Sequence, residues 1–505
     1  NLAAGYGPVF NRNAPLSDRT EGYSCPLFLF LMALLWKLPL GLEMLLRAKL
    51  VGIVCALAAL VVAQRLAQRV GLPVWAQAAT PLLLAVHTSF VITGIHGMET
   101  ILMTLLVTLS AYWFIGEWEA ERAGSEKVGL GSAFALAGCA LTRPEGLLFG
   151  VMALGLRVGS KRGRLNRREV RWLAALLVPV GAFLLWRHAY YGLWLPNTYY
   201  AKQLPAELAV VSGGKYLLNT FFRDLSGHPV YIALALGWWA LVGVGVVANR
   251  FQRAPGLIVP LLAGAQIVFV LKAGGDGMGG WRFMASALPL LMLLSVAGIA
   301  EIAEGLKRLG QASGPPLARA AIGALCAALL VTALWGHRDY WANPFLGFRS
   351  WASKGFTLSE RALLRGWLLE MTLASGDWLN ANVPPGSVIA YSEMGVTPYL
   401  CPQLRFLDVQ GLTDHGVATL PGVLHNGSGV MDQYTTTNDV VGRYLMETRK
   451  PDLVMRGVRT TESEPYFDET ILEGSYKLRA ALPLPPPDPN PNPGARSFML
   501  FWQRR

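Results

Sequence analysis

The chain has 505 residues, of which 53% are hydrophobic and only 15% charged, and its formal net charge is +12. Apolar runs of about 20 residues recur along it, a length that crosses a bilayer as a helix, so the composition indicates a polytopic α-helical membrane protein. The excess of Lys and Arg lies mainly in short loops beside these runs, which is typical of membrane topology and argues against a nucleic-acid partner.

About ten spans are predicted for a transmembrane domain covering residues 25–336: 25–40, 47–64, 72–92, 97–115, 129–156, 171–188, 229–248, 255–271, 284–300 and 317–336. Lys37 and Glu43 interrupt the first of them, and the sequence LTRPEG breaks the fifth. Residues 1–24 are predicted to be the remnant of an extracytoplasmic loop. The chain begins with Asn1 and shows no signal-peptide pattern, so we expect a fragment that lacks a true N-terminus.

Three basic loops recur on alternate sides in the second half of the chain: 157–171, 250–253 and 307–319. The positive-inside rule makes them cytoplasmic, in a bacterial plasma membrane. Four polar pieces then share the extracytoplasmic face: 1–24, 189–228, 272–283 and everything after about residue 337. In this count Arg65 and Arg69 also face outward, which the rule disfavours.

The apolar runs shorten from residue 337, and residues 337–505 are predicted to form a soluble extracytoplasmic α/β domain. An amphipathic helix is expected over residues 358–382, with Ser359 as its N-cap. The runs SVIAYS, RFLDVQG, PDLVMRG and SFMLFWQ are predicted as strands, and the proline-rich residues 483–494 as a loop. No internal repeat is found, which weighs against transporter folds built from two related halves.

Ionisable residues near membrane spans are costly, so they are hypotheses for a functional site. In TEGYSCP, Glu21 and Tyr23 lie just ahead of the first span, where the carboxylate either orients a sugar hydroxyl or is simply solvated. Glu99 lies in HGMET, and Arg143 and Glu145 flank Pro144 in LTRPEG. These three charges either contact substrate directly or form a structural ion pair that holds helices together, and both alternatives remain open.

Two further motifs are predicted on the extracytoplasmic face. LPNTYYAK carries Asn197, Tyr199 and Lys202, which suit a polar ligand, although an aromatic belt with an anchoring lysine also explains the tyrosines. KAGGDGMGGWRF carries Asp276 and Arg282 among glycines that let a backbone approach a bulky ligand. Its alternative is a tight turn with both charges solvated. Together the motifs suit an amphiphile with an anionic head and a lipid tail, such as a polyprenyl-phosphate sugar.

The succession NLAAGYGPVFNRNAPLSDRTEGYSCPLFLFL, HGMET, LTRPEG, LPNTYYAK, GGDGMGGWRF and FLDVQGLTDHGVA resembles the bacterial GT-C membrane glycosyltransferases. It is most similar to the group that contains the mycobacterial terminal β-(1→2)-arabinofuranosyltransferase, and more distantly to protein O-mannosyltransferases and the lipid A aminoarabinose transferase. The resemblance covers residue 1 to about 420. It implies transfer of a sugar, usually with inversion, from a polyprenyl-phosphate donor to an envelope glycan, lipid or protein acceptor on the extracytoplasmic face.

On this sequence the resemblance makes Lys202 and Arg282 candidates for phosphate contacts, with Arg143 behind them. Asp276 is the candidate catalytic carboxylate. The remaining candidates for substrate binding are Glu21, Tyr23, Glu99, Glu145, Asn197, Tyr199, Asp408 and Asp414. The two aspartates belong to LDVQGLTD in the C-terminal domain, which we expect to cover the site or bind acceptor; a turn-and-strand role for the segment is the alternative.

The chain departs from the family pattern at its start. The family's catalytic acidic residue precedes the stretch resembling NLAAGYG, so the resemblance places the main general base upstream of Asn1. We therefore expect the 505 residues alone to be inactive, and the protein with its upstream sequence to be active. Two other functions stay open: a transporter or flippase of a lipid-linked glycan, and an inactive lipid-glycan binding protein.

No cofactor is required by the sequence. The five cysteines have no ligand-like spacing, so neither a zinc site nor a disulfide framework is predicted. A divalent metal, Mg²⁺ or Mn²⁺, stays open, because Asp276 alone specifies neither.

Overall fold

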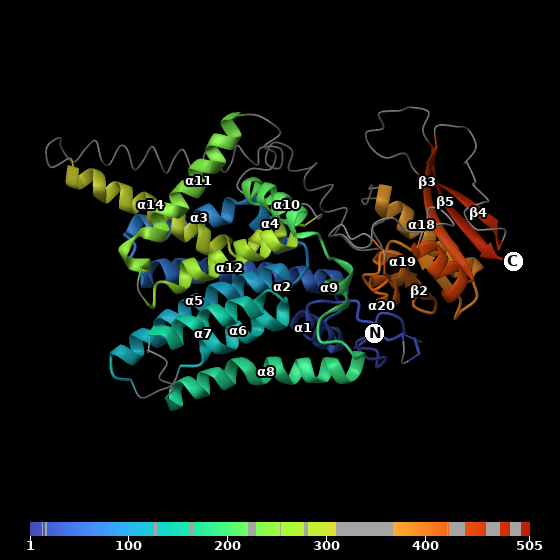
Figure 1. Ribbon diagram of the computed structural model, residues 1–505, viewed down its shortest axis with the longest axis horizontal. Coiled ribbons are helices and arrows are strands. Elements are labelled where there is room, and N and C mark those ends of the chain that lie inside the picture. The colour runs from blue at the N-terminus through green and yellow to red at the C-terminus, as the bar shows by residue number, and fades with distance from the viewer. Residues whose placement is uncertain are drawn as a thin grey trace.

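The computed structural model describes residues 1–12, 14–15, 18–125, 129–160, 166–220, 229–252, 254–276, 281–309, 367–421, 423, 440–460, 475–484 and 496–505. Within them the chain is mostly helical, with a sheet near the C-terminus. In Figure 1 helices such as α5, α7 and α8 run along the long axis, and the sheet lies beyond one end of them, beside the N-terminus. The predicted span 317–336 and the cap Ser359 lie outside the described residues.

The helical part comprises α1 (Pro26–Lys37), α2 (Met44–Arg69), α3 (Val74–Val86), α4 (Thr88–Ile95), α5 (Thr100–Arg122), α6 (Gly131–Thr142), α7 (Gly146–Ser160), α8 (Arg167–Tyr191), α9 (Asn197–Ala201), α10 (Ala206–Asn219), α11 (Pro229–Val247), α12 (Ile258–Ala273), α13 (Arg282–Ala285) and α14 (Leu288–Leu309). Four of the described helices, α2, α5, α8 and α14, are long and apolar enough to cross a membrane. The pair α3 and α4, bent by 62°, makes a fifth if it is one span. The predicted number of about ten spans is therefore not confirmed.

The two ends of the bundle differ in charge. Arg69 at the end of α2 pairs with Glu119 near the end of α5 at 3.3 Å, so these two helices are parallel. Arg250 donates to the carbonyl of Gly71 at 2.9 Å and thus lies at the same end. We call this end the basic end, and the opposite one, next to the sheet, the domain end. The topology prediction that placed Arg69 on the extracytoplasmic face is wrong, because Arg69 lies at the same end of the bundle as Arg250, which was predicted to be cytoplasmic.

The error in the predicted topology arises from the first and fifth predicted spans. Leu29 and Trp36 of α1 and Met44 of α2 all line one cavity with residues 398–406 of the C-terminal part, so α1 stays at the domain end. Its 12 residues extend only about 18 Å, less than a bilayer core of about 30 Å. One predicted crossing is thereby lost, while the fifth segment runs to the domain end and back.

The fifth segment is two antiparallel helices, α6 and α7. The amide of Ser132 in α6 donates to Glu117 near the end of α5, and Arg157 near the end of α7 also pairs with Glu117, at 3.5 Å. Between them, Arg143 is extended, as the residue before a proline prefers, and Pro144 cannot continue the helix. The chain thus turns at the domain end, and residues 157–160 return to the basic end.

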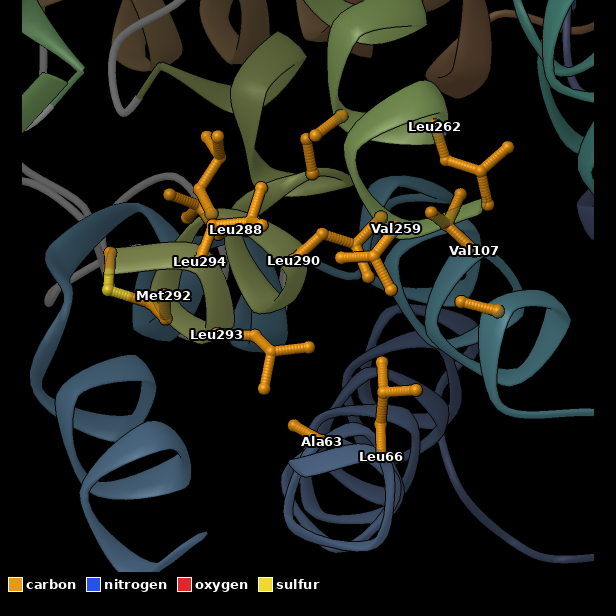
Figure 2. Close-up of a cluster of buried hydrophobic side chains, with 14 of the residues drawn as sticks. Ala63, Leu66, Val107, Val259, Leu262, Leu288, Leu290, Met292, Leu293 and Leu294 are labelled. Carbon is orange, nitrogen blue, oxygen red and sulfur yellow. The ribbon is translucent and has the colours of Figure 1, made fainter. Parts of the chain in front are cut away.

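The core of the bundle surrounds α14. Its side chains Leu288, Leu290, Met292, Leu293 and Leu294 are fully buried. Figure 2 shows them beside Ala63 and Leu66 of α2, Val107 of α5, and Val259 and Leu262 of α12. These helices come from the whole length of the helical part, so α14 holds the early and late segments together.

Glycines let α11 and α14 approach closely. A Cβ at Gly298 would lie 2.2 Å from the carbonyl oxygen of Leu241, whereas one at Gly243 would meet no atom within 4 Å. Small residues at such crossings permit tight helix packing in membranes. We expect Gly298→Ala to destabilise the protein by about 1–3 kcal/mol, because the helices must move apart. Thermal melting in detergent measures this, with Gly243→Ala as control; equal melting temperatures would contradict it.

The C-terminal part is a five-stranded mixed sheet with the order β2-β1-β3-β5-β4. Its strands are β1 (Val388–Tyr391), β2 (Arg405–Asp408), β3 (Leu453–Thr460), β4 (Tyr476–Leu484) and β5 (Arg496–Arg504). β1 pairs in parallel with β2 and β3, and β5 pairs antiparallel with β3 and β4. Its helical segments are α18 (Trp367–Asn382), α19 (Val396–Leu400), α20 (His415–Ala418), α21 (Val440–Arg443) and the π-helical turn Tyr444–Arg449.

The four predicted strands correspond to β1, β2, β3 and β5, and α18 is the described portion of the predicted helix 358–382. The missed strand is β4. Its last two residues, Pro483 and Leu484, begin the segment predicted as a loop, and they pair with β5 opposite Phe498 and Ser497. A proline is tolerated there because β4 is the outermost strand of the sheet.

Candidate functional site

Six charged side chains from four predicted motifs gather at the domain end, and we call them the charge cluster: Glu99, Glu145, Asp276, Arg143, Lys202 and Arg282. Its innermost part is Arg143, which pairs with Glu99 at 2.8 Å and with Glu145. All three residues are buried. Glu99 comes just before α5, while Arg143 and Glu145 lie at the turn between α6 and α7. The break at Pro144 therefore brings Arg143 to both carboxylates.

Asp276 and Arg282 form the second pair of the cluster. Arg282 Nε and Nη2 both donate to the Asp276 carboxylate, and the two side chains are only 11% and 6% exposed. The alternative of a turn with solvated charges is thus wrong. Glycines set the geometry before Asp276: Gly274 and Gly275 have φ of +76° and +88°, and a Cβ at Gly275 would lie 2.6 Å from the ring of Tyr216. Only glycine fits both demands without strain.

One aromatic ring joins the two pairs. The guanidinium of Arg143 lies 4.8 Å and that of Arg282 5.5 Å from the ring centre of Phe283. The amide of Phe283 donates to the hydroxyl of Tyr216 at 3.1 Å, which fixes the ring's backbone against α10. Arg282 Nη1 also lies 3.9 Å from the sulfur of Met98, the neighbour of Glu99. HGMET, LTRPEG and the GGD motif therefore form one site.

Lys202 lies on the exposed side of the cluster. It follows the short helix α9 and makes no ion pair with any residue in the described part of the chain. Desolvation lowers the pKa of its ammonium group, Asp276 raises it, and the guanidinium groups of Arg282 and Arg143 lower it further. Lys202 is thus a cation held near two others, and it is available to an anionic ligand.

Glu21 and Asn197, predicted to contact sugars, are instead engaged with the protein. The Glu21 carboxylate accepts from the amide of Asn197 at 2.8 Å and from Arg187 at 2.7 Å. Asn197 Nδ2 donates to the carbonyls of Gly411 and Leu412 at 2.7 and 3.0 Å. Both side chains are buried. Asn197 joins the helical part to the C-terminal domain, and Glu21 holds Asn197 from the helical side.

The predicted tyrosines differ in exposure. Tyr23 shares a 3.1 Å hydrogen bond with the hydroxyl of Tyr191, which also donates to the carbonyl of Pro8. Tyr199 is 45% exposed and packs edge-on against Tyr200. Tyr199 is therefore free to contact a ligand, while Tyr23 is tied to the start of the chain and the end of α8.

The two predicted aspartates of the C-terminal domain hold local structure. Asp408 accepts from the amides of Gln410 and Thr413 at 2.9 and 2.8 Å, and burial raises its pKa to about 6. Asp414 caps α20 by accepting from the amide of Val417, and it pairs with Arg449 at 3.3 Å. These contacts fit the turn-and-strand alternative for LDVQGLTD.

Glu21 is a buried carboxyl group with a raised pKa. Burial raises its pKa from 4.5 to about 7, although Arg187 and the amide of Asn197 lower it. The folded protein therefore holds this proton more tightly than the unfolded chain does. Its contribution to the free energy of unfolding is complete below about pH 4.5 and is lost as the pH rises through about 7.

We therefore expect wild type to lose up to about 3 kcal/mol of stability relative to Glu21→Gln between those two pH values. The glutamine does not titrate, so its stability lacks this dependence. Melting temperatures of both proteins across the pH range measure the difference. Two parallel pH profiles would show that Glu21 is ionised throughout.

A cavity of about 440 Å³ lies between the N-terminal segment, α1 and the residues around α19. Its lining is mostly apolar and includes Phe10, Met32, Trp36, Tyr399 and Phe406. Of the predicted site residues, only Tyr23 lines it. The charge cluster is not part of this cavity.

A divalent metal does not fit the described residues well. No three His, Cys, Asp or Glu side chains in the described part of the chain lie close enough to share an ion. Asp276, the carboxylate that left a metal open, faces Arg282 instead.

Several residues at the domain end were not predicted from the sequence. Arg187 lies inside α8 and reaches Glu21, 166 positions away. His415 Nδ1 lies 2.9 Å from Asn197 Oδ1, and Arg449 pairs with Asp18 at 2.9 Å. The position of Arg187 in a predicted span was the one available hint, since a buried arginine needs a partner.

The chain is similar to known proteins in two respects. Residues 362–501 match the profile of a domain of unknown function, DUF8728. Over 191 residues the chain is 29% identical to the terminal β-(1→2)-arabinofuranosyltransferase of Mycobacterium tuberculosis H37Rv. This match covers 34% of the chain and 29% of the length of that relative. The chain is thus distantly similar to a glycosyltransferase, and its long apolar helices indicate a membrane protein.

Proposed function

We propose that the protein is a membrane glycosyltransferase of the GT-C type that moves a sugar from a polyprenyl-phosphate donor to a cell-envelope glycan, lipid or protein acceptor. The observation that carries this proposal is the charge cluster, in which Lys202 has no ion-pair partner among the described residues and lies near Arg282 and Arg143. The distant similarity to an arabinofuranosyltransferase makes an arabinofuranosyl donor the first to test.

The cations suit the phosphate of the donor. The cluster without ligand is balanced, because three carboxylates face three cations. A sugar on a phosphodiester linkage brings one negative charge, and the departing phosphate carries a second. Lys202 supplies an ammonium group without an ion-pair partner among the described residues. The planar guanidinium of Arg282 suits phosphate because two of its N–H groups can donate to it together. Charge that develops on the leaving phosphate is then stabilised by groups already in place.

The transfer itself is a single displacement. The acceptor hydroxyl oxygen forms a bond to the anomeric carbon, while the bond from that carbon to the phosphate oxygen breaks and its electron pair leaves with the polyprenyl phosphate. Attack from the opposite side inverts the anomeric centre. The hydroxyl proton passes to a carboxylate. Among the described residues, Asp276 is our candidate for that role.

We place this reaction on the extracytoplasmic face of a bacterial plasma membrane. The basic end of the bundle carries Arg69, Arg157 and Arg250, which the positive-inside rule assigns to the cytoplasm. The domain end then faces outward together with the charge cluster. The polar groups gather at that end rather than along a path through the bundle. This arrangement favours a transferase over a flippase.

The test is transfer of labelled sugar from a polyprenyl-phosphate arabinofuranose to envelope acceptors, by the chain together with any upstream residues of its reading frame. Lys202→Ala is expected to raise the KM for the donor about tenfold or more, since a hydrogen bond to a charged group contributes about 1.5–3 kcal/mol. Lys215→Ala, an exposed lysine of α10, is the matched control. Absence of transfer across a broad donor panel would overturn the proposal.

A further inference from the structure

The contact between α9 and α20 links the C-terminal domain to Lys202. Asn197, the first residue of α9, is fully buried, and every polar atom of its side chain binds the C-terminal domain. Nδ2 donates to the carbonyls of Gly411 and Leu412, so Oδ1 is left to accept from His415 Nδ1 at 2.9 Å. This is a specific site of attachment rather than a loose surface contact.

The tautomer of His415 follows from this arrangement. Because Asn197 Oδ1 can only accept, His415 Nδ1 carries the proton, and Nδ1 keeps that proton whether the ring is neutral or charged. The ring also lies edge-on to Tyr200 of α9, with 5.4 Å between the ring centres. His415 therefore holds α9 by a hydrogen bond at its start and by an aromatic contact further along.

Helix α9 is short, so the position of Asn197 at its start determines the position of Lys202 directly after its end. Lys202 lies five positions after Asn197, a rise of about 7.5 Å along a helix. Glu21 accepts from the amide of Asn197, which anchors the same residue from the helical part of the protein. The start of α9 is thus fixed from both sides, and Lys202 at its other end is close enough to Asp276 and Arg282 for their charges to affect its pKa.

We propose that the C-terminal domain of unknown function positions the donor-binding lysine: His415, Gly411 and Leu412 fix Asn197, and α9 carries that placement to Lys202. His415 and Asn197 are then positioning residues that act through Lys202 and touch no substrate. The inference rests on the proposed role of Lys202 in donor binding, and it gives the domain a role in the transferase site besides covering it.

Kinetics of the complete protein test this. His415→Ala is expected to raise the KM for the polyprenyl-phosphate sugar by roughly two- to tenfold, the loss that follows removal of one hydrogen bond. His415→Asn places an amide donor where Nδ1 lies and should restore the wild-type KM. In a Lys202→Ala background, His415→Ala should have no further effect on KM, because the two residues act in series.

Equal effects of His415→Ala with and without Lys202 would overturn the proposal, as would a failure of His415→Asn to restore KM. Lys477→Ala, at an exposed position of β4, is the control and should leave KM unchanged. If His415→Ala does not fold, Asn197→Asp tests the same link, because it keeps the size of the side chain and removes both donors to Gly411 and Leu412.

A second measurement is independent of activity. The rate at which an amine-reactive reagent labels Lys202, followed by mass spectrometry across a range of pH, gives the pKa of Lys202. His415→Ala should raise that pKa toward its ordinary value as α9 loosens, and should leave the profile of Lys215 unchanged. An unchanged Lys202 profile overturns the positioning role. If wild type labels as expected but transfers no sugar, the proposed function fails while the structural link stands.

Discussion

Replacing Asp276 with Asn is expected to lower the turnover number, kcat, of sugar transfer by about 10²–10⁴-fold, the range that a lost general base produces. An amide has nearly the same size and keeps one oxygen for Arg282, so the turn after Gly275 should still form. It cannot accept the proton of the acceptor hydroxyl. Initial rates with labelled donor and acceptor measure the change. Asp377→Asn, on an exposed position of α18, is the matched control.

The pairing of Asp276 with Arg282 leaves a second role for the carboxylate, namely orienting the guanidinium, and a double variant separates the two. If Asp276 only orients Arg282, then Asp276→Asn has no further effect once Arg282 is alanine. If Asp276 takes the proton, Asp276→Asn lowers kcat in that background as well. We expect the second result. Retention of kcat within a few-fold in Asp276→Asn alone would contradict both roles.

Hydropathy in the sequence identifies the long helices α2, α5, α8 and α14, because each is a continuous apolar run. It does not distinguish α1 from a span. Its apolar composition equals that of a span, and only its 12-residue length and its contacts beside α19 show that it stays at the domain end. The break at Pro144 is visible in the sequence, but the return of α7 to Glu117 depends on a partner from α5.

The sequence predicts which residues belong to the charge cluster, but it does not predict which of them pair with each other. HGMET, LTRPEG and the GGD motif stand out because charges near apolar runs are costly, and the structure brings them together around Phe283. Glu21 and Asn197 stand out for the same reason. A polar residue beside a span looks the same in sequence whether its partner is a ligand or a distant segment, and the partner of Asn197, His415, is 218 positions away.

The second large effect is expected from Arg143. Arg143→Met should destabilise the protein by about 3–5 kcal/mol, because it leaves the carboxylates of Glu99 and Glu145 buried without a cation. The free energy of unfolding in detergent, or the melting temperature as its proxy, measures this loss. Adding Glu99→Gln and Glu145→Gln should recover most of it, since a neutral set of similar volume has no buried charge to compensate.

The triple variant also separates the two alternatives for these residues, which single substitutions cannot do. If Arg143 only joins the ends of α5 and α6 through its two carboxylates, the neutral triple variant folds and transfers sugar at the wild-type rate. If Arg143 also stabilises the donor phosphate, the variant folds but keeps a raised KM. We expect the raised KM, about tenfold, the size of one charge-assisted contact. Arg143 and Arg282 flank the same ring, so a phosphate bound by one lies near the other. Because the triple variant removes two negative charges along with one positive charge, a raised KM would come from the lost contact and not from a change in net charge.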